Sequence, residues 1–493
     1  MPTKMRMRSA SAMQRIMSIA LARLYNIRES ILIVATVGVG VLLAVGLYSP
    51  SQSLAIAAAG ICVYAVVIMI DPLKGMVMWL ITQPLLEEYL NFSLGAGIPD
   101  LSLSRLCTAL ITVLLLARIA TGYRRLQSID KFDVLVLLFI LGMMQSGARG
   151  LHGIRSMQDV FDSFWIPALT YFAIKNVVTS RESVHLVLYA VVCVALYSAV
   201  YAFYESMTGH VLFAPPDVKR YFYVDSGLRI LRGIWGSNVG FGRIFNMAIP
   251  ILFYFYLKAP SLFRKVFFVI CLGLVFGGLY LTYKRTAWMA MVAVMFVMQF
   301  FYPQFRRMFI VILIVVGIAT ALNWDTINSS TVYTDRVNSE ESTQKERTSG
   351  WENAMEFWRR SPLLGHGFQQ YRILAREAGY KDQAVESEYF EILVSAGLAG
   401  FLPYVGLLLL MVHQGFQHYR GRVADGLADR DLVAVFWGVM TSYLISIATS
   451  TMRELAVPSL FFAVAGAILY ARRSSLSELP EMKAERFKMP LYR

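Results

Sequence analysis

Long apolar stretches recur along the whole chain of 493 residues and are joined by polar connections. A helix of about 17 to 25 apolar residues crosses the roughly 30 Å hydrocarbon core of a bilayer. Hydrophobic residues make up 57% of the chain and charged residues only 16%, which excludes an ordinary soluble protein. The sequence therefore predicts an all-α integral membrane protein, a polytopic bundle of about 12–14 transmembrane helices with one long extracytoplasmic helical loop. The spans are placed near residues 30–48, 53–70, 74–90, 101–119, 132–147, 159–177, 184–206, 238–257, 266–283, 286–302, 307–323, 397–415, 432–449 and 456–471.

Lysine and arginine lie in alternate connections between these spans, which predicts that these connections and both termini face the cytoplasm. The basic inner residues include Arg118, Arg124, Arg125, Lys131, Lys175, Arg181, Lys258, Arg264, Lys265, Arg306, Arg307, Arg420, Arg422 and Arg472. Because they account for much of the net charge of +14, no nucleic-acid partner is expected. The expected organisation is a basic cytoplasmic tail (1–29), an N-terminal transmembrane bundle (30–323), an outward-facing loop or cap (324–396), C-terminal transmembrane helices (397–471) and a second basic cytoplasmic tail (472–493).

Motifs of several other classes of membrane protein are missing from the sequence. There is no GxxxxGK[ST] phosphate loop, no HExxH and no internal repeat, which disfavours an ATP-driven pump and a zinc peptidase. The four cysteines fall within predicted spans without paired spacing, so we expect neither disulfides nor a metal site from them.

Several cations stand on the outward side, against the orientation bias. Lys284 and Arg285 fill a tight hairpin between two apolar runs. Arg232 lies in a glycine-rich segment, Leu231 to Arg243, in which a helix is expected to begin. A single charge at a span end can be an interface anchor. Several arginines on one face favour a phosphate site, because the guanidinium fork donates two parallel hydrogen bonds.

The polar segment from Asn323 to Ala396, about 70 residues, is too long for a plain connector. Ser349 and Glu352 have the spacing of a capping box, and Trp351, Ala354, Met355 and Trp358 follow at helical spacing up to Pro362. This predicts an amphipathic helix that packs its aromatic stripe on the bundle, and a second short helix reaching about Gly379. His366 lies in a glycine turn between them and is either an exposed turn residue or a catalytic base.

Glu386 and Glu388 open the next span. Carboxylates at a helix start can simply complement the helix dipole. They can also act as general bases, and Glu391, one turn after Glu388, would make the Glu388 carboxylate more basic by like-charge repulsion. Both interpretations remain open from the residues alone.

Three blocks of sequence together resemble the O-antigen ligase and Wzy-type polysaccharide polymerase superfamily. They are R-G-I-W-G-S-N from Arg232, L-T-Y-K-R-T-A-W from Leu281, and the run from Arg347 through S-P-L-L-G-H-G-F and E-S-E-Y-F-E-I-L to A-G-L-A-G. The resemblance covers residues 230–415. Where ligases of this family usually have His-Asn, this chain has Glu386-Ser387, so the mechanism that ligases base on that histidine is not expected here.

The resemblance implies a metal-independent glycosyltransferase of the bacterial inner membrane, without cofactor, acting on the periplasmic face. Its donor would be an undecaprenyl-diphosphate-linked oligosaccharide. By position, Arg232 and Arg285, with Lys284 and Arg347, would hold the diphosphate, and the base would be Glu386, Glu388 or His366, in that order. A polymerase of exopolysaccharide or O-antigen repeat units is the first interpretation and a glycan ligase the second. A lipid-linked oligosaccharide flippase is the alternative from another class. Membrane lipids, a chain-length regulator and a separate flippase are the expected partners.

Overall fold

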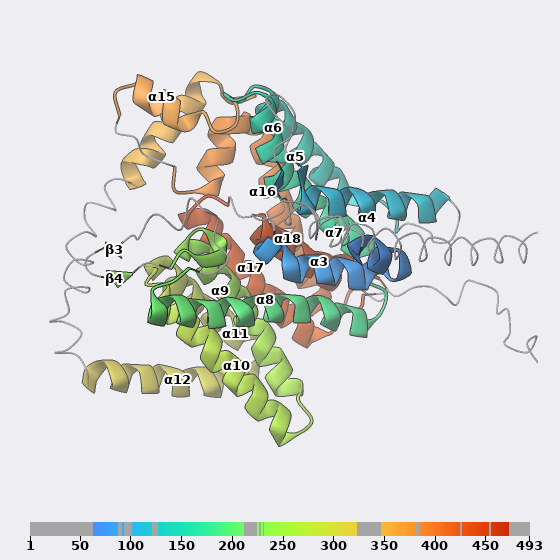
Figure 1. Cartoon of the computed structure of the whole chain (residues 1–493), viewed down its shortest axis with the longest axis vertical. Helices are drawn as coiled ribbons and strands as arrows, with labels where there is room; N and C mark the ends of the chain where they lie inside the picture. Colours follow the sequence, from blue (N-terminus) through green and yellow to red (C-terminus); the bar gives the residue numbers. More distant parts are fainter. Residues whose placement is uncertain are drawn as a thin grey trace, which may run out of the picture.

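The structure, a computed structural model, is an all-α polytopic membrane protein, as the hydropathy pattern predicted (Figure 1). It describes residues 63–86, 91–92, 101–120, 127–211, 224–225, 228–229, 231–322, 347–380, 385–423, 426–452 and 455–472. The predicted first span, most of the second, and the two basic tails apart from Arg472 lie outside these residues.

Helices account for most of the described chain. Besides helical residues at 63–70 and 347–360, they are α3 (Pro72–Leu86), α4 (Leu103–Ala120), α5 (Lys131–Ala148), α6 (Ile154–Val160), the π-helix η1 (Phe161–Trp165), α7 (Ile166–Val177), α8 (Arg181–Thr208), the 3-10 turn η3 (Gly233–Trp235), α9 (Asn238–Lys258), α10 (Leu262–Leu281), α11 (Arg285–Phe301), α12 (Pro303–Leu322), α15 (Tyr371–Glu377), α16 (Glu388–Tyr419), α17 (Arg430–Thr449), α18 (Ala456–Ala465) and the π-helix η4 (Gly466–Tyr470). Two antiparallel pairs of two-residue strands complete the described elements: β1 (Asn91–Phe92) with β2 (Leu101–Ser102), and β3 (Val224–Asp225) with β4 (Leu228–Arg229).

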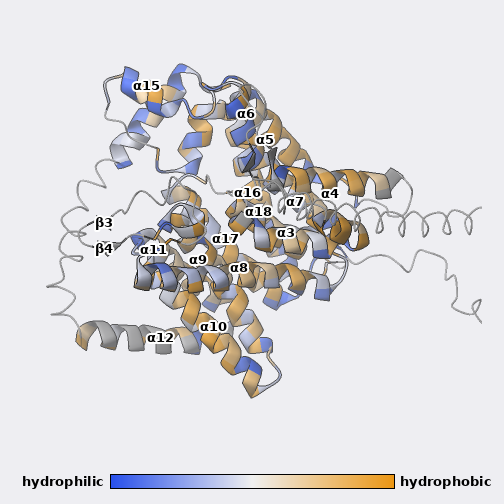
Figure 2. Ribbon diagram, viewed as in Figure 1, coloured by the Kyte–Doolittle hydropathy of each residue, from blue (hydrophilic) through white to orange (hydrophobic). Residues whose placement is uncertain are grey.

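Six of the described helices are long and apolar enough to cross a membrane: α5, α8, α9, α10, α16 and α17. Three shorter apolar helices lie at Ser104–Ala117, Arg285–Phe301 and Ala456–Tyr470. Most of α5 and α10 is orange, and so apolar, in Figure 2, whereas the helices around α15 are mixed in polarity. The total of 12–14 spans stays a prediction, since part of the apolar sequence is outside the described residues.

Helix α9 is the centre of the bundle. In its apolar window 89% of the residues are buried, against 33% in α10, so α9 has protein on all sides and α10 faces lipid. Helices α8, α10, α11 and α17 pack around it. Two polar side chains inside α9 bond to neighbouring segments: the Asn246 amide donates to the Ala287 carbonyl, and Arg243 donates to the Ser450 hydroxyl and the Thr451 carbonyl.

A break in α16 locks the turn at residues 362–368 into the bundle. Gly397 has φ 60° and ψ −157°, a backbone conformation that only glycine adopts readily. At this break the N–H groups of Leu398 and Ala399 donate to the carbonyls of Pro362 and Leu363. In the other direction, the N–H groups of residues 366 and 367 donate to the carbonyls of residues 394 and 395. The carbonyls and N–H groups left over by the break are thus satisfied by the turn.

The same interlock includes α5 and requires glycine for space. The N–H of Phe368 donates to the Ser146 carbonyl, and the Ser146 hydroxyl donates to the Ser395 carbonyl at 2.8 Å. A Cβ on Gly365 would lie 2.5 Å from the backbone carbonyl of Ser395, and a Cβ on Gly397 would lie 2.5 Å from Leu363. The glycines of the G-H-G and A-G-L-A-G blocks therefore permit backbone to pass directly over backbone.

The described part of the long loop forms a helical cap on α5 and α16, at the top of Figure 1. Ala354, Phe357, Tyr371 and Ala375 are buried together in a small apolar cluster of their own, completed by Val385 and Val394. Burial raises the pKa of Tyr371 to about 12, so its hydroxyl stays protonated and donates to the Gly350 carbonyl at 3.0 Å. The predicted pair of helices is confirmed.

Two details of the cap prediction are wrong. The helix already includes Arg347, so Ser349 lies inside it and is not the residue that caps it. The buried stripe is also turned about one position from the predicted one: Phe357 is fully buried, while Trp351 and Trp358 are half-buried. Trp351 stacks on Phe390 at the start of α16, with ring centroids 5.7 Å apart. The residues just before Arg347 are also polar, so the Ser-x-x-Glu spacing alone does not identify the first residue of this helix.

We predict that Gly397→Ala destabilises the protein strongly. The alanine would have to hold a strained φ, at about 1–3 kcal/mol, and would also push the turn away. The thermal midpoint of the purified protein in detergent should fall by several degrees and activity should be lost with it. Gly273→Ala on α10 is the matched control, because nothing lies within 4 Å of the added methyl group. A Gly397→Ala protein as stable as Gly273→Ala would contradict this account of the interlock.

Candidate functional site

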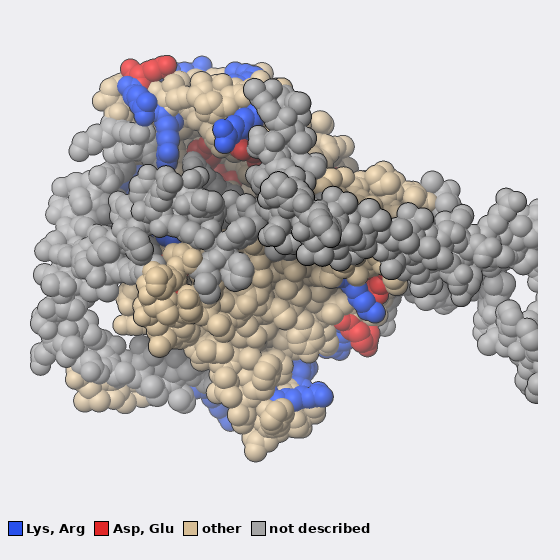
Figure 3. Space-filling model, in the orientation of Figure 1, with Lys and Arg blue, Asp and Glu red and all other residues tan. Residues whose placement is uncertain are grey.

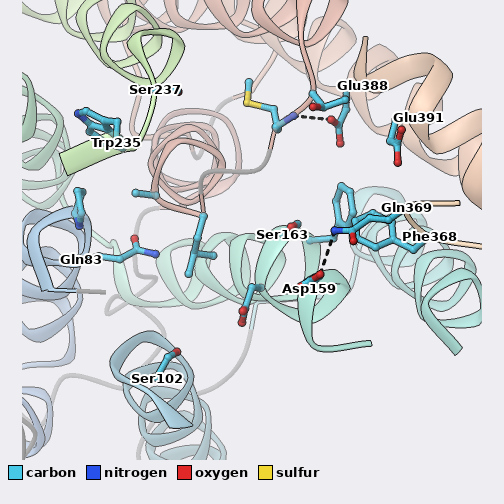
Figure 4. A pocket seen from close by; sticks show the side chains of 18 of the residues that line it. Gln83, Ser102, Asp159, Ser163, Trp235, Ser237, Phe368, Gln369, Glu388 and Glu391 are labelled. Carbon is cyan, nitrogen blue, oxygen red and sulfur yellow. Dashed lines mark hydrogen bonds between the residues drawn. The ribbon is translucent and has the colours of Figure 1, made fainter. Parts of the chain in front are cut away.

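A cavity of about 530 Å³ lies between the cap and the bundle, within the range of about 300–1,000 Å³ typical of small-molecule sites. Segments far apart in sequence form its walls: the end of α3, β2, the α6–η1 helix, the turn before α9, residues 368–369, the start of α16, and the chain from residue 451 to the start of α18. In Figure 4, Glu388, Glu391, Phe368 and Gln369 lie on one side and Gln83 and Trp235 on the other. The described lining residues are Gln83, Pro84, Ser102, Asp159, Asp162, Ser163, Phe164, Ile234, Trp235, Gly236, Ser237, Phe368, Gln369, Glu388, Glu391, Thr451, Met452, Leu455 and Ala456.

Two buried carboxylates stand one helical turn apart at the start of α16. Glu388 is 3% exposed and accepts a hydrogen bond from the Met452 N–H at 2.6 Å. Glu391 is 9% exposed and accepts from the Ser395 hydroxyl at 3.4 Å. Carboxylate oxygens held at a cavity wall by hydrogen bonds can accept a proton from a bound hydroxyl group. This is the environment that a general base needs.

The backbone donor to Glu388 is itself held by a buried arginine. Arg243, in α9, is 3% exposed, and its Nη2 donates to the Ser450 hydroxyl at 2.7 Å and to the Thr451 carbonyl at 2.9 Å. These contacts fix the chain just after α17, next to Met452. Arg243 therefore positions the N–H that Glu388 accepts from.

The opposite acidic wall is a π-helix. Residues Asp162, Ser163 and Phe164 of η1 line the cavity, and one-turn π-helices occur often at functional sites. Asp162 is held by Arg105 through two parallel bonds, Nε to Oδ1 at 2.9 Å and Nη2 to Oδ2 at 2.5 Å. The Arg105 guanidinium thus neutralises one of the four carboxylates that line the cavity.

Gln369 connects this wall to the cap. Its amide donates to Asp159 Oδ2 at 3.0 Å, and its φ is 61°, an uncommon value for a residue other than glycine. Such strain persists only where the surrounding structure holds it. Here the interlocked turn just before it, residues 362–368, supplies that support.

A second cavity of about 250 Å³ adjoins the first. Gln369 and Glu391 line both cavities, so these two side chains form the wall between them. The other described residues of the second cavity are Leu151, His152, Tyr371, Arg372, Ile373 and Val385. In Figure 3 acidic atoms are set back in a hollow beneath the cap, with basic side chains beside it.

The structure separates the three predicted bases. Glu388 lines the cavity, whereas Glu386 is exposed and paired with Arg347, Nε to Oε2 at 2.6 Å. His366 is half-buried within the interlock, where its Nε2 bonds the Phe357 carbonyl at 2.7 Å and its N–H bonds the Val394 carbonyl. Neither Glu386 nor His366 is among the described residues lining the two cavities.

The predicted cations are all half-buried and surround the cavity rather than line it within the described residues. Arg232 directly precedes the segment 233–237, most of which forms the cavity wall. Arg285 and Lys284 begin α11, and the Asn238 amide donates to the Thr282 carbonyl at 3.0 Å. This bond brings the first two sequence blocks together, so Arg232 and Arg285 belong to adjoining segments. Arg347 joins the cap helix to Glu386.

Sequence reasoning missed Gln83, Asp159, Asp162 and Gln369, each of which lines the cavity. Asp159 and Asp162 were detectable as two carboxylates inside a predicted span, where charge is costly and usually functional. Gln83 gave a weaker signal as a lone amide in an apolar run. Gln369 gave none, because its neighbours are ordinary cap residues.

No group of three or more histidine, cysteine, aspartate or glutamate side chains within the described residues is arranged to hold a metal ion. Cys107, Cys193 and Cys271 are free thiols in helices.

Comparison with known proteins agrees with this geometry. Residues 267–405 match the family model described as O-Antigen ligase. The match runs from α10 through the cap and the interlock to the first half of α16, and so includes Arg285, Glu388 and Glu391. No curated protein matches the chain. Over this region the chain is similar to the O-antigen ligase family, which supports the resemblance to the O-antigen ligase and Wzy-type polymerase superfamily.

Proposed function

We propose that the protein is a polysaccharide polymerase that joins undecaprenyl-diphosphate-linked repeat units for an exopolysaccharide or O-antigen. The observation that carries the proposal is the pair of adjoining cavities that meet at Gln369 and Glu391, with Glu388 beside them. Transfer of a glycan needs a donor and an acceptor sugar side by side at one proton acceptor. The family match supports glycosyl transfer from a lipid-linked donor in general.

The reaction needs one base and one site of positive charge. A hydroxyl of the acceptor sugar loses its proton to the base as its oxygen attacks the anomeric carbon of the donor. The bond from that carbon to the diphosphate oxygen breaks, and undecaprenyl diphosphate leaves with the electron pair. Because the leaving group already carries two phosphates, cationic side chains that stabilise it and a positioned carboxylate are sufficient for chemistry.

Glu388 is the best candidate for the base. It lines the larger cavity, is buried, and is oriented by the Met452 N–H. Glu391, at the wall between the cavities, is the next candidate. Glu386 and His366 fall behind them, since Glu386 is exposed beside Arg347 and His366 is held by the cap backbone.

We predict that Glu388→Gln lowers turnover by roughly 10²–10⁴-fold, because glutamine keeps the bond from Met452 but cannot take a proton. The assay is conversion of lipid-linked repeat units to polymer by the purified protein. Glu386→Gln is the matched control, being the same change two positions away on an exposed side chain, and should cost little.

The outcome that contradicts this assignment is normal polymer from Glu388→Gln together with a strong loss in Glu386→Gln or His366→Asn. The glycans of a deletion strain, resolved by gel, separate the two activities within the family. Single repeat units left on the lipid indicate a lost polymerase. Full-length chains left on the carrier indicate a lost ligase, and normal glycan on a normal carrier pool would refute both.

The diphosphate would bind beside Arg232 and Arg285, with Lys284 next to Arg285. Two helices begin there: Ser237 caps α9 by accepting from the Gly240 N–H, and α11 starts at Arg285. Helix starts present free N–H groups and favour anions. Arg347 is a weaker member of this group because Glu386 already pairs with it.

Arg285→Ala should nearly abolish polymer, since losing a charge-paired contact to a desolvated phosphate costs on the order of 2–5 kcal/mol. Arg285→Lys should restore little, because an ammonium lacks the bidentate fork. Arg307→Ala, an exposed arginine at the start of α12, serves as the control and should leave activity intact. Normal polymer from Arg285→Ala at an unchanged protein level would remove Arg285 from the site.

The protein would work in the bacterial inner membrane with the cap in the periplasm and both termini in the cytoplasm. Helix α9 runs from Asn238, beside the cavity, to Lys258, and its 21 residues span about 30 Å. The Lys258 end of α9 carries basic residues of the predicted inner loops. Lys258 pairs with Asp431, and Arg181 pairs with the nearby Asp429. Basic residues at the end opposite the cavity agree with a cytoplasmic position.

Cysteine labelling tests this orientation. In a background without Cys62, Cys107, Cys193 and Cys271, Ala378→Cys in the cap should react with a membrane-impermeant maleimide in cells whose inner membrane is intact. Lys265→Cys, exposed at the start of α10, should react only after that membrane is permeabilised. The reverse pattern would place the cavity on the cytoplasmic side.

A further inference from the structure

Gln83 is a buried amide at the wall of the larger cavity. Its side chain is 1% exposed, and neither Oε1 nor Nε2 has a hydrogen-bond partner in the part of the chain that the structure describes. Figure 4 shows the amide directed into the cavity from the side opposite Gln369 and Glu391. A glutamine amide has two donor hydrogens and an acceptor oxygen, so its whole hydrogen-bonding capacity is open to this cavity.

An amide left in this state is unfavourable unless something in the cavity completes it. Buried polar groups in native proteins are nearly always hydrogen-bonded, and an unsatisfied one lowers stability. Leucine or methionine would fill the same space without that loss. The amide is therefore explained best by a ligand group that both accepts and donates hydrogen bonds.

The end of α3 is held firmly enough to present this amide in one orientation. Pro84 follows Gln83 inside the helix, and the Tyr197 hydroxyl donates to the Ile81 carbonyl at 2.9 Å. One turn earlier, the Trp79 indole N–H donates to the Ser104 hydroxyl at 3.3 Å. These two contacts tie α3 to α8 and to α4 just before Gln83.

An aromatic ring and a hydroxyl accompany the amide. Trp235 is buried, its indole N–H is anchored on the Ser198 hydroxyl at 3.2 Å, and its ring lines the cavity. Ser102 accepts from the Arg105 N–H at 3.3 Å, which leaves its hydroxyl hydrogen for a further acceptor. A rigid aromatic face with amide and hydroxyl groups beside it suits a sugar ring, which is apolar on its face and polar at its edge.

We propose that Gln83 is a specificity-determining residue, and that with Trp235 and Ser102 it binds a sugar ring of the lipid-linked substrate through an acetamido group or a pair of neighbouring hydroxyls. The proposal rests on the function proposed above. Two neighbouring hydroxyls present an acceptor and a donor side by side, and an acetamido group presents a carbonyl acceptor on one edge and an N–H donor on the other, so the Gln83 amide can bond either substituent. The ring bound here lies across the cavity from Glu388, so Gln83 selects the substrate without taking part in proton transfer.

The test measures binding of the lipid-linked repeat units that accumulate in a deletion strain to the purified protein in nanodiscs. Gln83→Leu should raise their Kd on the order of 10–100-fold, the loss of one or two hydrogen bonds. Its thermal midpoint should stay the same or rise, because an unsatisfied amide is replaced by an apolar side chain. Gln83→Glu keeps the acceptor and the shape, and should weaken binding as well. Gln83→Met repeats the comparison if the leucine variant does not accumulate.

Gln145→Leu is the matched control. Gln145, in α5, also has both amide atoms buried and without a partner among the described residues, but it lines neither cavity. Its replacement should leave the Kd unchanged. N-deacetylated repeat units then identify the group that Gln83 reads: if the difference between wild type and Gln83→Leu disappears with them, the group is an acetamido group, and if it persists, it is a pair of hydroxyls.

Equal Kd values for wild type, Gln83→Leu and Gln145→Leu would overturn the proposal and leave Gln83 as a packing defect. The same holds if both leucine variants weaken binding alike. Failure of the wild-type protein to bind lipid-linked units at all is a different result, since it would refute the proposed function itself.

Discussion

The interlock between the 362–368 turn and the break in α16 is the constraint on which the site depends. Backbone bonds run in both directions across it, and Ser146 of α5 closes it from the third side. One end of the interlock leads to Phe368 and Gln369, and the helix it breaks begins with Glu388 and Glu391. Cap and membrane helix therefore reach the cavity as one rigid unit, and the separation of the side chains that meet there is set by main-chain bonds.

The cavity combines acidic walls with basic surroundings. Glu388 and Glu391 are buried together, while Arg105 and Arg243 hold the opposite wall and the segment at Ser450. Arg232 and Arg285 stand at neighbouring helix starts outside the acidic wall. This division suits a reaction in which a proton leaves the acceptor at one place and negative charge develops on a phosphate at another.

The hydropathy pattern predicted the fold class, because burial in lipid leaves few alternatives to apolar helices. The cap helices were also predictable from spacing, although their start and buried face were not, since Arg347 is already helical and Phe357 replaces Trp358 as the buried ring. At the site, sequence placed Glu386 ahead of Glu388 by position. Only the three-dimensional structure shows that two residues along the chain separate an exposed ion pair from a buried carboxylate. Gln83 and Gln369 could not be predicted as site residues, because contacts between segments far apart in the sequence leave no periodic pattern of apolar residues.

In the function that we propose, recognition and chemistry come from different parts of the molecule. Gln83 is carried by α3, with Trp235 in the turn before α9, whereas Glu388 and Glu391 are carried by α16. Residues 267–405, which match the family, include the second group and exclude the first. A change in α3 can therefore alter which sugar fits without disturbing the interlock or the base. Conversely, Glu388 could be kept as the proton acceptor while the residues that bind the sugar change. The Gln83 amide and the Trp235 indole would act on the sugar ring only through hydrogen bonding and shape. The physical separation of the two walls allows one catalytic arrangement to serve different repeat units.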